Sequence, residues 1–354
     1  MSNQARLLLL SGTGGSGTTS ACTATVAALE DEGLRACSLD PFVSGIDGTG
    51  DFDETAAAAL AALTGVTHGH PVQWWGSVPV ASYLVAWRRI REATQAAGVD
   101  AVVVDLGDLR QAIAMIDFPS AVLRVIAASV TPDVASRSDA DAEDSAFSVL
   151  SAASIAMAAS ATLLESDRTA IRLVAEGRAH SVDRVLRAAA VLAMLGVDVD
   201  GIIVNRCARK SNGATATELN EQRDLLAMAE RSADGPLVWK STDRIRPVPK
   251  GRSATGSLGR SNVLRDDTLV VEPDEDGFTL HIPLSGLGVM GARVGRYEDS
   301  LVVAMDGSTR WLDLPSVLRR CRAVEAQRTD SGLRVEFVPD PSLWREDART
   351  EGAA

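Results

Sequence analysis

Residues 11–20 read SGTGGSGTTS, and the segments on either side of them have the patterns of a strand and a helix. The apolar run Leu7–Leu10 comes before the glycines, and the helix-favouring segment Ala21–Gly33 follows, with Gly33 placed to end the helix. In this order, backbone N–H groups of the loop converge on an anion, with the positive end of the helix behind them. We therefore expect a strand–loop–helix unit of the phosphate-loop type, and a tight strand–helix turn without a ligand is the alternative.

Three further apolar runs end at a polar side chain. They are Leu34–Leu39 before Asp40-Pro41, Ala101–Val104 before Asp105, and Gly201–Val204 before Asn205. Continuous apolar strands separated by helices indicate a parallel sheet with helices on both faces, so the fold class is α/β. Ligands of such sheets bind outside the carboxyl ends of the strands, where Asp40, Asp105 and Asn205 are expected.

The pattern changes after residue 246. Residues 247–262, PVPKGRSATGSLGRSN, form a polar Pro/Gly/Ser segment. Beyond it, apolar residues alternate with polar or small ones at 278–284 and 333–337, and Asp-Gly and Ser-Gly turns separate the runs. We predict an α/β domain at 1–246, a linker at 247–265, an all-β sandwich at 266–340 and a disordered tail at 341–354.

Composition narrows the class of protein. The 354-residue chain is 46% hydrophobic and has a formal net charge of −12, which argues against a nucleic-acid binder and a basic membrane-surface protein. The four cysteines, at 22, 37, 207 and 321, lack the spacing of a zinc site or a disulfide framework. We therefore expect free thiols in the cytoplasm, and no signal peptide.

Residues 146–164, AFSVLSAASIAMAASATLL, contain no charge and are mostly Ala and Ser. Serine lowers the tendency of a segment to enter a bilayer, so we predict a buried or groove-lining helix without stable membrane insertion. Its adaptable Ala/Ser/Met face suits a hydrophobic client segment, and burial inside the protein is the alternative.

Residues 12–19 fit the phosphate-loop pattern GxxxxGK[ST] at every position but one, because Thr18 stands where the pattern has lysine. In this pattern Thr19 would place its hydroxyl on Mg²⁺. Lysine occurs only at 210, 240 and 250, so none lies near the loop in sequence. The candidate nucleotide-binding residues are Gly12, Gly14, Gly15, Gly17, Thr18, Thr19, Ser20 and Asn205.

The loop GTGGSGTT resembles the deviant motif GKGGxGKT of the ArsA-type ATPases, the family of the arsenite-pump and tail-anchored-protein-targeting ATPases. Its wider class includes the MinD/ParA ATPases. Both motif lysines are replaced here, by Thr13 and Thr18. In the family, the first lysine reaches across a dimer to the partner's nucleotide. The resemblance implies a P-loop fold and ATP or ADP with Mg²⁺ as its ligand.

Other segments carry the same resemblance. Asp40-Pro41 is similar to the family's first switch, whose aspartate orients the attacking water, so Asp40 is the candidate catalytic residue. Asp105 stands in the second switch, which implies that Thr19 and Asp105 hold the metal. Val204-Asn205-Arg206 resembles the NR motif, whose asparagine lies at the adenine. Residues 314–321 and 332–337 are similar to the small heat-shock (α-crystallin-like) domain of bacterial ArsA-type proteins.

Two replaced lysines and a rewritten second switch are three losses from the family's catalytic pattern. Losing the charge that stabilises the transition state commonly costs on the order of several kcal/mol, or roughly a thousandfold in rate. We therefore expect a non-catalytic or weakly active scaffold or chaperone-like subunit that binds apolar client segments or a partner. An active ATP-dependent targeting or anion-linked ATPase is the alternative. A MinD/ParA-like positioning factor is a third interpretation, against which the C-terminal sandwich argues.

The same substitutions predict the assembly. With Thr13 in place of the lysine, two copies that close over nucleotide would face each other with less charge compensation. We expect either a homodimer formed through apolar surface or a pair with an intact ArsA-type paralogue that supplies its own lysines. No nucleic-acid partner is expected.

Overall fold

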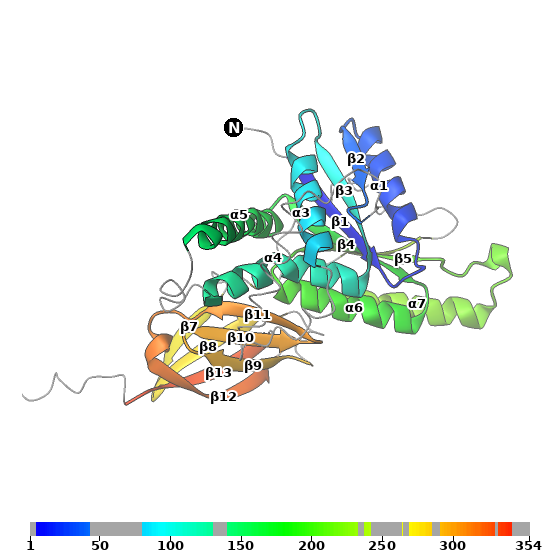
Figure 1. Cartoon of the computed structure of the whole chain (residues 1–354). Helices are drawn as coiled ribbons and strands as arrows, with labels where there is room; N and C mark the ends of the chain where they lie inside the picture. Colours follow the sequence, from blue (N-terminus) through cyan, green and yellow to red (C-terminus); the bar gives the residue numbers. More distant parts are fainter. Residues whose placement is uncertain are drawn as a thin grey trace, which may run out of the picture.

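The structure is a computed structural model, and it describes residues 5–42, 80–129, 140–232, 237–241, 264, 269–284, 291–329 and 332–341. These residues form a six-stranded sheet with helices on both faces, followed by two small antiparallel sheets (Figure 1). The predicted parallel sheet and C-terminal sandwich are thus confirmed. Most of the predicted linker 247–265 and all but the first residue of the predicted tail 341–354 lie outside the described residues.

The large sheet has the strand order β2-β3-β1-β4-β5-β6, and its neighbouring strands are all parallel. Its strands are β1 (Arg6–Gly12), β2 (Ala36–Leu39), β3 (Ala101–Asp108), β4 (Thr169–Glu176), β5 (Val199–Asn205) and β6 (Leu237–Lys240). The chain passes from β1 to the edge strand β2, returns to β3 beside β1, and then crosses to β4 on the other side of β1. The crevice that such a reversal creates therefore lies at the carboxyl end of β1, where the glycine loop begins.

Helices cover both faces because β1 is apolar at every position of its centre. Leu8 and Leu10 pack with α1 (Thr18–Asp31), while Leu7 and Leu9 belong to the larger core cluster on the opposite face. The helices that contribute to the larger cluster are α3 (Val80–Gln95), α4 (Leu109–Ser129), α5 (Ala140–Glu165), α6 (Ala179–Met194) and α7 (Ala216–Ser232). The predicted stop after α1 is present, since Gly33 has a φ of 83°.

The C-terminal region is a sandwich of a three-stranded and a four-stranded sheet, with the orders β11-β10-β9 and β12-β13-β8-β7. Its strands are β7 (Val270–Asp274), β8 (Gly277–Pro283), β9 (Arg293–Tyr297), β10 (Ser300–Met305), β11 (Ser308–Asp313), β12 (Cys321–Thr329) and β13 (Gly332–Pro339). The alternation seen in the sequence places Leu280 and Ile282 of β8, and Val335 and Phe337 of β13, in the core.

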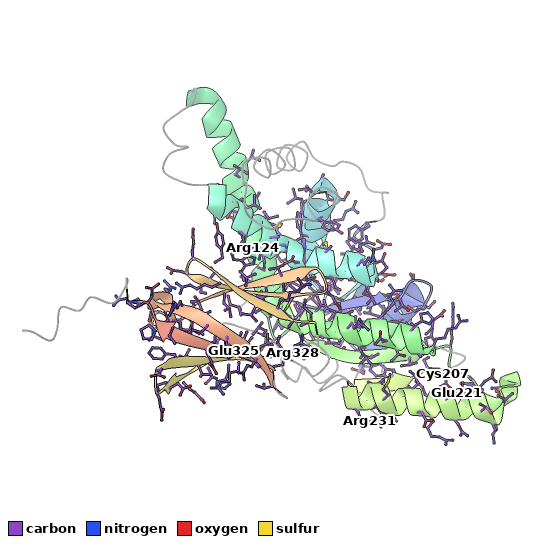
Figure 2. All side chains as sticks on the ribbon, turned by 90° about the horizontal axis from the view of Figure 1, so that it is seen from below. Arg124, Cys207, Glu221, Arg231, Glu325 and Arg328 are labelled. Atoms are coloured by element: carbon purple, nitrogen blue, oxygen red, sulfur yellow. The ribbon has the colours of Figure 1, made fainter. Side chains whose placement is uncertain are left out.

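The sandwich packs against the helices of the first domain. Arg310 of β11 donates to the carbonyl oxygen of Leu195 at the end of α6 (3.3 Å) and pairs with Glu165 at the end of α5 (3.3 Å). The guanidinium of Arg124 on α4 lies 6.0 Å from the centre of the Trp311 ring, and Figure 2 labels Arg124 at this junction. The buried apolar cluster continues through both units. An ion pair, a cation–ring contact and shared apolar packing therefore hold the sandwich against the first domain.

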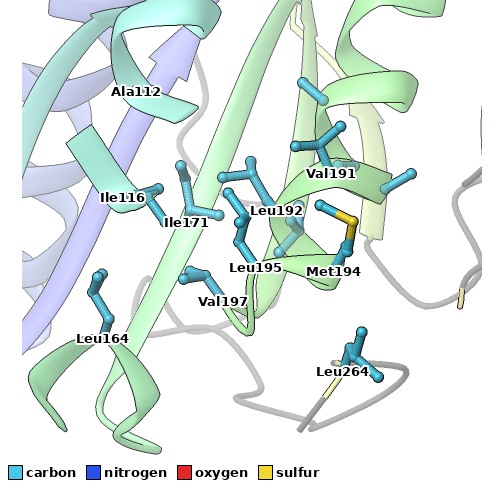
Figure 3. Close-up of a cluster of buried hydrophobic side chains, with 14 of the residues drawn as sticks. Ala112, Ile116, Leu164, Ile171, Val191, Leu192, Met194, Leu195, Val197 and Leu264 are labelled. Carbon is cyan, nitrogen blue, oxygen red and sulfur yellow. The ribbon is translucent and has the colours of Figure 1, made fainter. Parts of the chain in front are cut away.

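Leu264 lies within the predicted linker, yet its side chain is fully buried. Its N–H donates to the carbonyl oxygen of Ala193 on α6 at 2.9 Å. Figure 3 draws Leu264 with the apolar side chains at the end of α6, below Met194. This residue is therefore part of the packing between the two units.

Candidate functional site

The glycine loop joins β1 to α1 at the carboxyl edge of the large sheet. Gly14, Gly15 and Gly17 have φ angles of 52°, 70° and 94°, in the left-handed region that favours glycine. Gly12 approaches β4 so closely that a Cβ there would lie 2.6 Å from the carbonyl oxygen of Val174. No side chain caps α1, so the first N–H groups of the helix are free to face an anion.

The loop opens into a cleft of about 430 Å³ at the switch point of the sheet. Its described lining residues are Gly14, Gly15, Gly17, Thr18, Thr19, Ser20, Asp40, Phe42, Asp105, Gly107, Asp108 and Gln111. The structure therefore brings together both switch aspartates and every predicted loop residue except Gly12, which is buried beneath the loop. The sequence had given no role to Phe42, Asp108 or Gln111.

Two side chains of this cleft, those of Thr19 and Asp105, could hold a metal ion. The Thr19 hydroxyl donates to Oδ2 of Asp105 at 2.7 Å, and Oδ1 of Asp105 accepts the N–H of Gly107 at 2.9 Å. Asp40 is exposed just after the neighbouring strand β2, and its Oδ1 accepts the N–H of Phe42 at 2.9 Å. The pair Thr19–Asp105 offers hard oxygen donors of the kind that Mg²⁺ prefers.

The two positions where the family has lysine carry short hydroxyl side chains that face the protein's own residues. The Thr13 hydroxyl lies 2.6 Å from the hydroxyl of Ser181, which also accepts the N–H of Glu176 at 2.8 Å. Thr18 is half-buried, with its Oγ1 3.5 Å from Oγ of Ser16. Sequence reasoning missed Ser181, because it lies 168 residues from Thr13 and belongs to no motif.

Asn205 lies beside the loop but does not line the cleft formed by the described residues. Its side chain is buried, and its amide donates to the carbonyl oxygen of Ser16 at 2.8 Å. This bond braces the glycine loop against the end of β5. The predicted contact of Asn205 with an adenine base stays a prediction.

The charge of the cleft is negative. Asp40, Asp105 and Asp108 line it, and no lysine or arginine is among its described lining residues. The sequence has no lysine or arginine between Arg6 and Arg35 or between Arg35 and Arg88, so neither the loop, α1 nor the first switch supplies one. Burial raises the pKa of the Cys22 thiol on α1, and the carboxylates of Asp105 and Asp40 raise it further.

Two sequence families match this chain. Residues 52–228, half of the chain, match the family of anion-transporting ATPases of the ArsA type, and residues 275–337 match the HSP20-like domain found in ArsA. The chain belongs to the ArsA family. The predicted membership, with a C-terminal small heat-shock-like domain, is therefore confirmed.

Two relatives of this ArsA-family protein match it over different extents. The uncharacterized protein SCO2128 of Streptomyces coelicolor is 27% identical over 96% of this chain and 99% of that protein. Protein Rv2184c of Mycobacterium tuberculosis is 28% identical over 52% of this chain and 53% of that protein. The first relative therefore matches both units, and its name states no activity.

The predicted apolar helix is α5, which begins at Ala140. Within the described residues, its segment Ser148–Glu165 is long and apolar enough to cross a membrane by length and composition, with a mean hydropathy of 1.4. Only 28% of that segment is buried. Met157 packs inward, whereas Ile155 is 70% exposed. In the described structure, one face of this apolar helix is thus exposed.

Proposed function

We propose that this ArsA-family protein binds Mg²⁺ with ATP or ADP in the cleft but hydrolyses ATP slowly or not at all, and that it works as a scaffold or chaperone-like subunit. The composition of the cleft carries this proposal. It combines free backbone N–H groups, Thr19 and three carboxylates, with no lysine or arginine among the described lining residues.

The groups that would hold a magnesium nucleotide fit that role. The uncapped first turn of α1 and the left-handed glycines supply N–H groups for phosphate oxygens. Thr19 and Asp105, joined at 2.7 Å, would hold the metal. When bound, Mg²⁺ would supply the positive charge that the loop lacks, and would offset part of the repulsion between phosphate and the three carboxylates.

The groups that stabilise charge on a transferring phosphoryl group are the ones replaced. Thr13 and Thr18 are neutral, and their hydroxyls lie against Ser181 and Ser16. Loss of one such stabilising group commonly costs about 3–4 kcal/mol, or about 10²–10³-fold in rate. Asp40 remains to orient water, but orientation without charge stabilisation supports only slow turnover.

Calorimetric titration with ATP and Mg²⁺ tests nucleotide binding. We expect saturable binding by the wild type and a loss of about tenfold or more in Thr19→Ala, because that variant removes a metal ligand and the bond to Asp105. Thr23→Ala is the matched control, since Thr23 is an exposed threonine one turn further along α1 and does not line the cleft. Equal affinities of wild type and Thr19→Ala would contradict the assignment.

The exposed face of α5 supports the proposal that the protein binds an apolar client or partner. Ile155 stands out from this face, and the neighbouring exposed residues are small (Ser151, Ala158, Ala159 and Thr162). A fluorescent Leu/Ala peptide should bind the wild type and bind Ile155→Ser more weakly. Val324→Ser is the matched control, because Val324 is also an exposed apolar residue but lies on β12. Equal loss in both variants would contradict a site on α5.

The assembly that we propose is a dimer whose formation does not require nucleotide, either with a second copy or with an intact ArsA-type paralogue. It is supported by Thr13, a neutral side chain bonded to Ser181 where the family has its trans-acting lysine. Sedimentation with and without Mg²⁺–ATP should give one unchanged state. A shift to dimer driven by ATP would favour the active-ATPase alternative. A monomer that also recovers no paralogue would contradict both forms of the proposal.

We also propose that the protein works in the cytoplasm. All four cysteines lie in the described part of the chain, and all are free thiols. Burial raises the pKa of Cys37, Cys207 and Cys321, as it does that of Cys22. Such protonated thiols are typical of a reducing compartment.

A further inference from the structure

A second cavity opens at the same edge of the large sheet, on the face opposite α1. It measures about 470 Å³, within the ~300–1,000 Å³ typical of small-molecule sites. Its lining residues come from the ends of β4 and β5 and from α6 and α7: Glu176, Gly177, Arg178, Ala179, Arg206, Ala208, Glu218, Glu221, Gln222 and Leu225. None of them lines the nucleotide cleft, so this cavity is a separate site.

The most buried polar residue among those that line this cavity is Gln222. Gln222 is only 9% exposed, and no hydrogen bond joins its amide to another described residue. A Cβ on Gly177 would lie 2.8 Å from Nε2 of Gln222, so a larger residue at this position would displace the amide. The amide atoms of Gln222 are open to the cavity, so a molecule bound there can form hydrogen bonds with them.

One wall of the cavity is cationic. Arg206 pairs with Glu176 at 2.8 Å, and Arg178 pairs with the same carboxylate at 3.7 Å. Two guanidinium groups thus share a single carboxylate. Arg206 also has a φ of 54°, a left-handed backbone that is uncommon for arginine and that clusters at functional sites. Because α6 begins at Ala179 without a side-chain cap, its free N–H groups add to the positive potential.

The other wall is acidic and belongs to α7. Glu218 and Glu221 are three residues apart, so they share a face of this helix. Both glutamates are exposed, and the Glu218 carboxylate accepts the N–H and the hydroxyl of Thr215. Glu221 lines the same cavity as Arg206 and Ala208, which follow β5. The acidic wall therefore faces the end of β5, where the cationic wall begins.

We propose that this cavity binds a small zwitterion, an amino acid or short peptide. Its carboxylate would lie against Arg178 and Arg206, its ammonium group against Glu221, and an amide group against Gln222. The cavity offers one cationic wall, one acidic wall and a buried amide between them, and a molecule with both charges and an amide satisfies all three. A purely anionic ligand would be repelled by the acidic wall, and a purely cationic one by the two guanidinium groups.

Calorimetry of the full chain with triglycine and with L-glutamine tests the proposal and separates the peptide from the amino-acid source. At least one should bind saturably. N-acetyl-triglycine and triglycine amide, each lacking one charge, should bind about tenfold more weakly than triglycine if the peptide is the ligand. Absence of saturable binding by both probes would overturn the proposal. Binding of L-glutamine alone would assign the site to free amino acids, and its N-acetyl and methyl-ester forms would then serve as the blocked probes.

Variants locate the binding. The Arg206→Gln variant should bind the probe and its carboxylate-blocked form with equal affinity. The Glu221→Gln variant should bind the probe and its ammonium-blocked form with equal affinity. Gly177→Ala should lower the affinity about tenfold by displacing the Gln222 amide. Gly295→Ala is the matched control, because a Cβ there would meet no atom within 4 Å. Thr19→Ala should bind like the wild type, and loss of binding in that variant would instead place the probe in the nucleotide cleft.

Discussion

Replacement of Thr18 by lysine would return one positive charge to the nucleotide cleft. Thr18 is the first residue of α1, is half-buried, and lines the cleft together with Asp40, Asp105 and Asp108. Two unit charges 4 Å apart interact by about 4 kcal/mol at an effective dielectric constant of 20. The new ammonium group would already be attracted to the three carboxylates before nucleotide binds. We therefore expect about a third of that value, ~1.4 kcal/mol, as added affinity for Mg²⁺–ATP, which is about tenfold in Kd.

Titration calorimetry at fixed ionic strength measures this gain. Thr18→Met is the matched control, because methionine has a long unbranched side chain without the charge. The lysine variant should bind Mg²⁺–ATP about tenfold more tightly than the methionine variant, and the difference should shrink as salt is raised. Equal affinity of the lysine and methionine variants would refute the argument that the cleft lacks a cation.

Three further predictions concern stability and are measured as the free energy of unfolding in urea. Asp200→Ala should cost about 3–5 kcal/mol, because it leaves the charge of Arg172 buried without its ion-pair partner, and the double replacement with Arg172→Met should cost less. Burial raises the pKa of Asp117, so its contribution is present below the ordinary Asp pKa of about 4 and is lost as pH rises through the raised value; Asp117→Asn should flatten this dependence. Gly277→Ala should cost about 3 kcal/mol because its Cβ would overlap a carbonyl oxygen of β13, whereas Gly295→Ala should change stability by less than about 1 kcal/mol.

The sequence predicted those parts of the nucleotide cleft that are formed by short, recognisable segments. The loop, the start of α1 and the strand that ends at Asp105 each show a pattern of ten residues or fewer. Parallel strands then bring their carboxyl ends together, which places Thr19 against Asp105. This contact between residues 86 apart was predictable because a motif fixed one partner and a strand end the other.

The residues that were missed depend on packing rather than on pattern. Ser181 contacts Thr13 because α6 begins close to the end of β4, beside the loop. The sequence around Ser181 contains no pattern that predicts this contact. Gln222 resembles any polar residue of an amphipathic helix until α7 packs over Gly177. Leu264 lies in the predicted linker 247–265, where most residues are polar or small, so its burial could not be read from the sequence. Each of these three residues has its position because of a tertiary contact, and the periodicity of a single sequence does not predict such contacts.

The central claim is that the cleft holds Mg²⁺–ATP without the charge needed to split it. A single-turnover experiment tests this directly. Protein in excess over γ-labelled ATP and Mg²⁺ is quenched over time, and released phosphate is counted, with Thr19→Ala as the binding-deficient control. We predict that the bound ATP is recovered intact over many minutes. Phosphate should be released no faster than in the presence of Thr19→Ala. Release of one phosphate per bound ATP within seconds, lost in Thr19→Ala, would contradict the claim and identify an active ATPase.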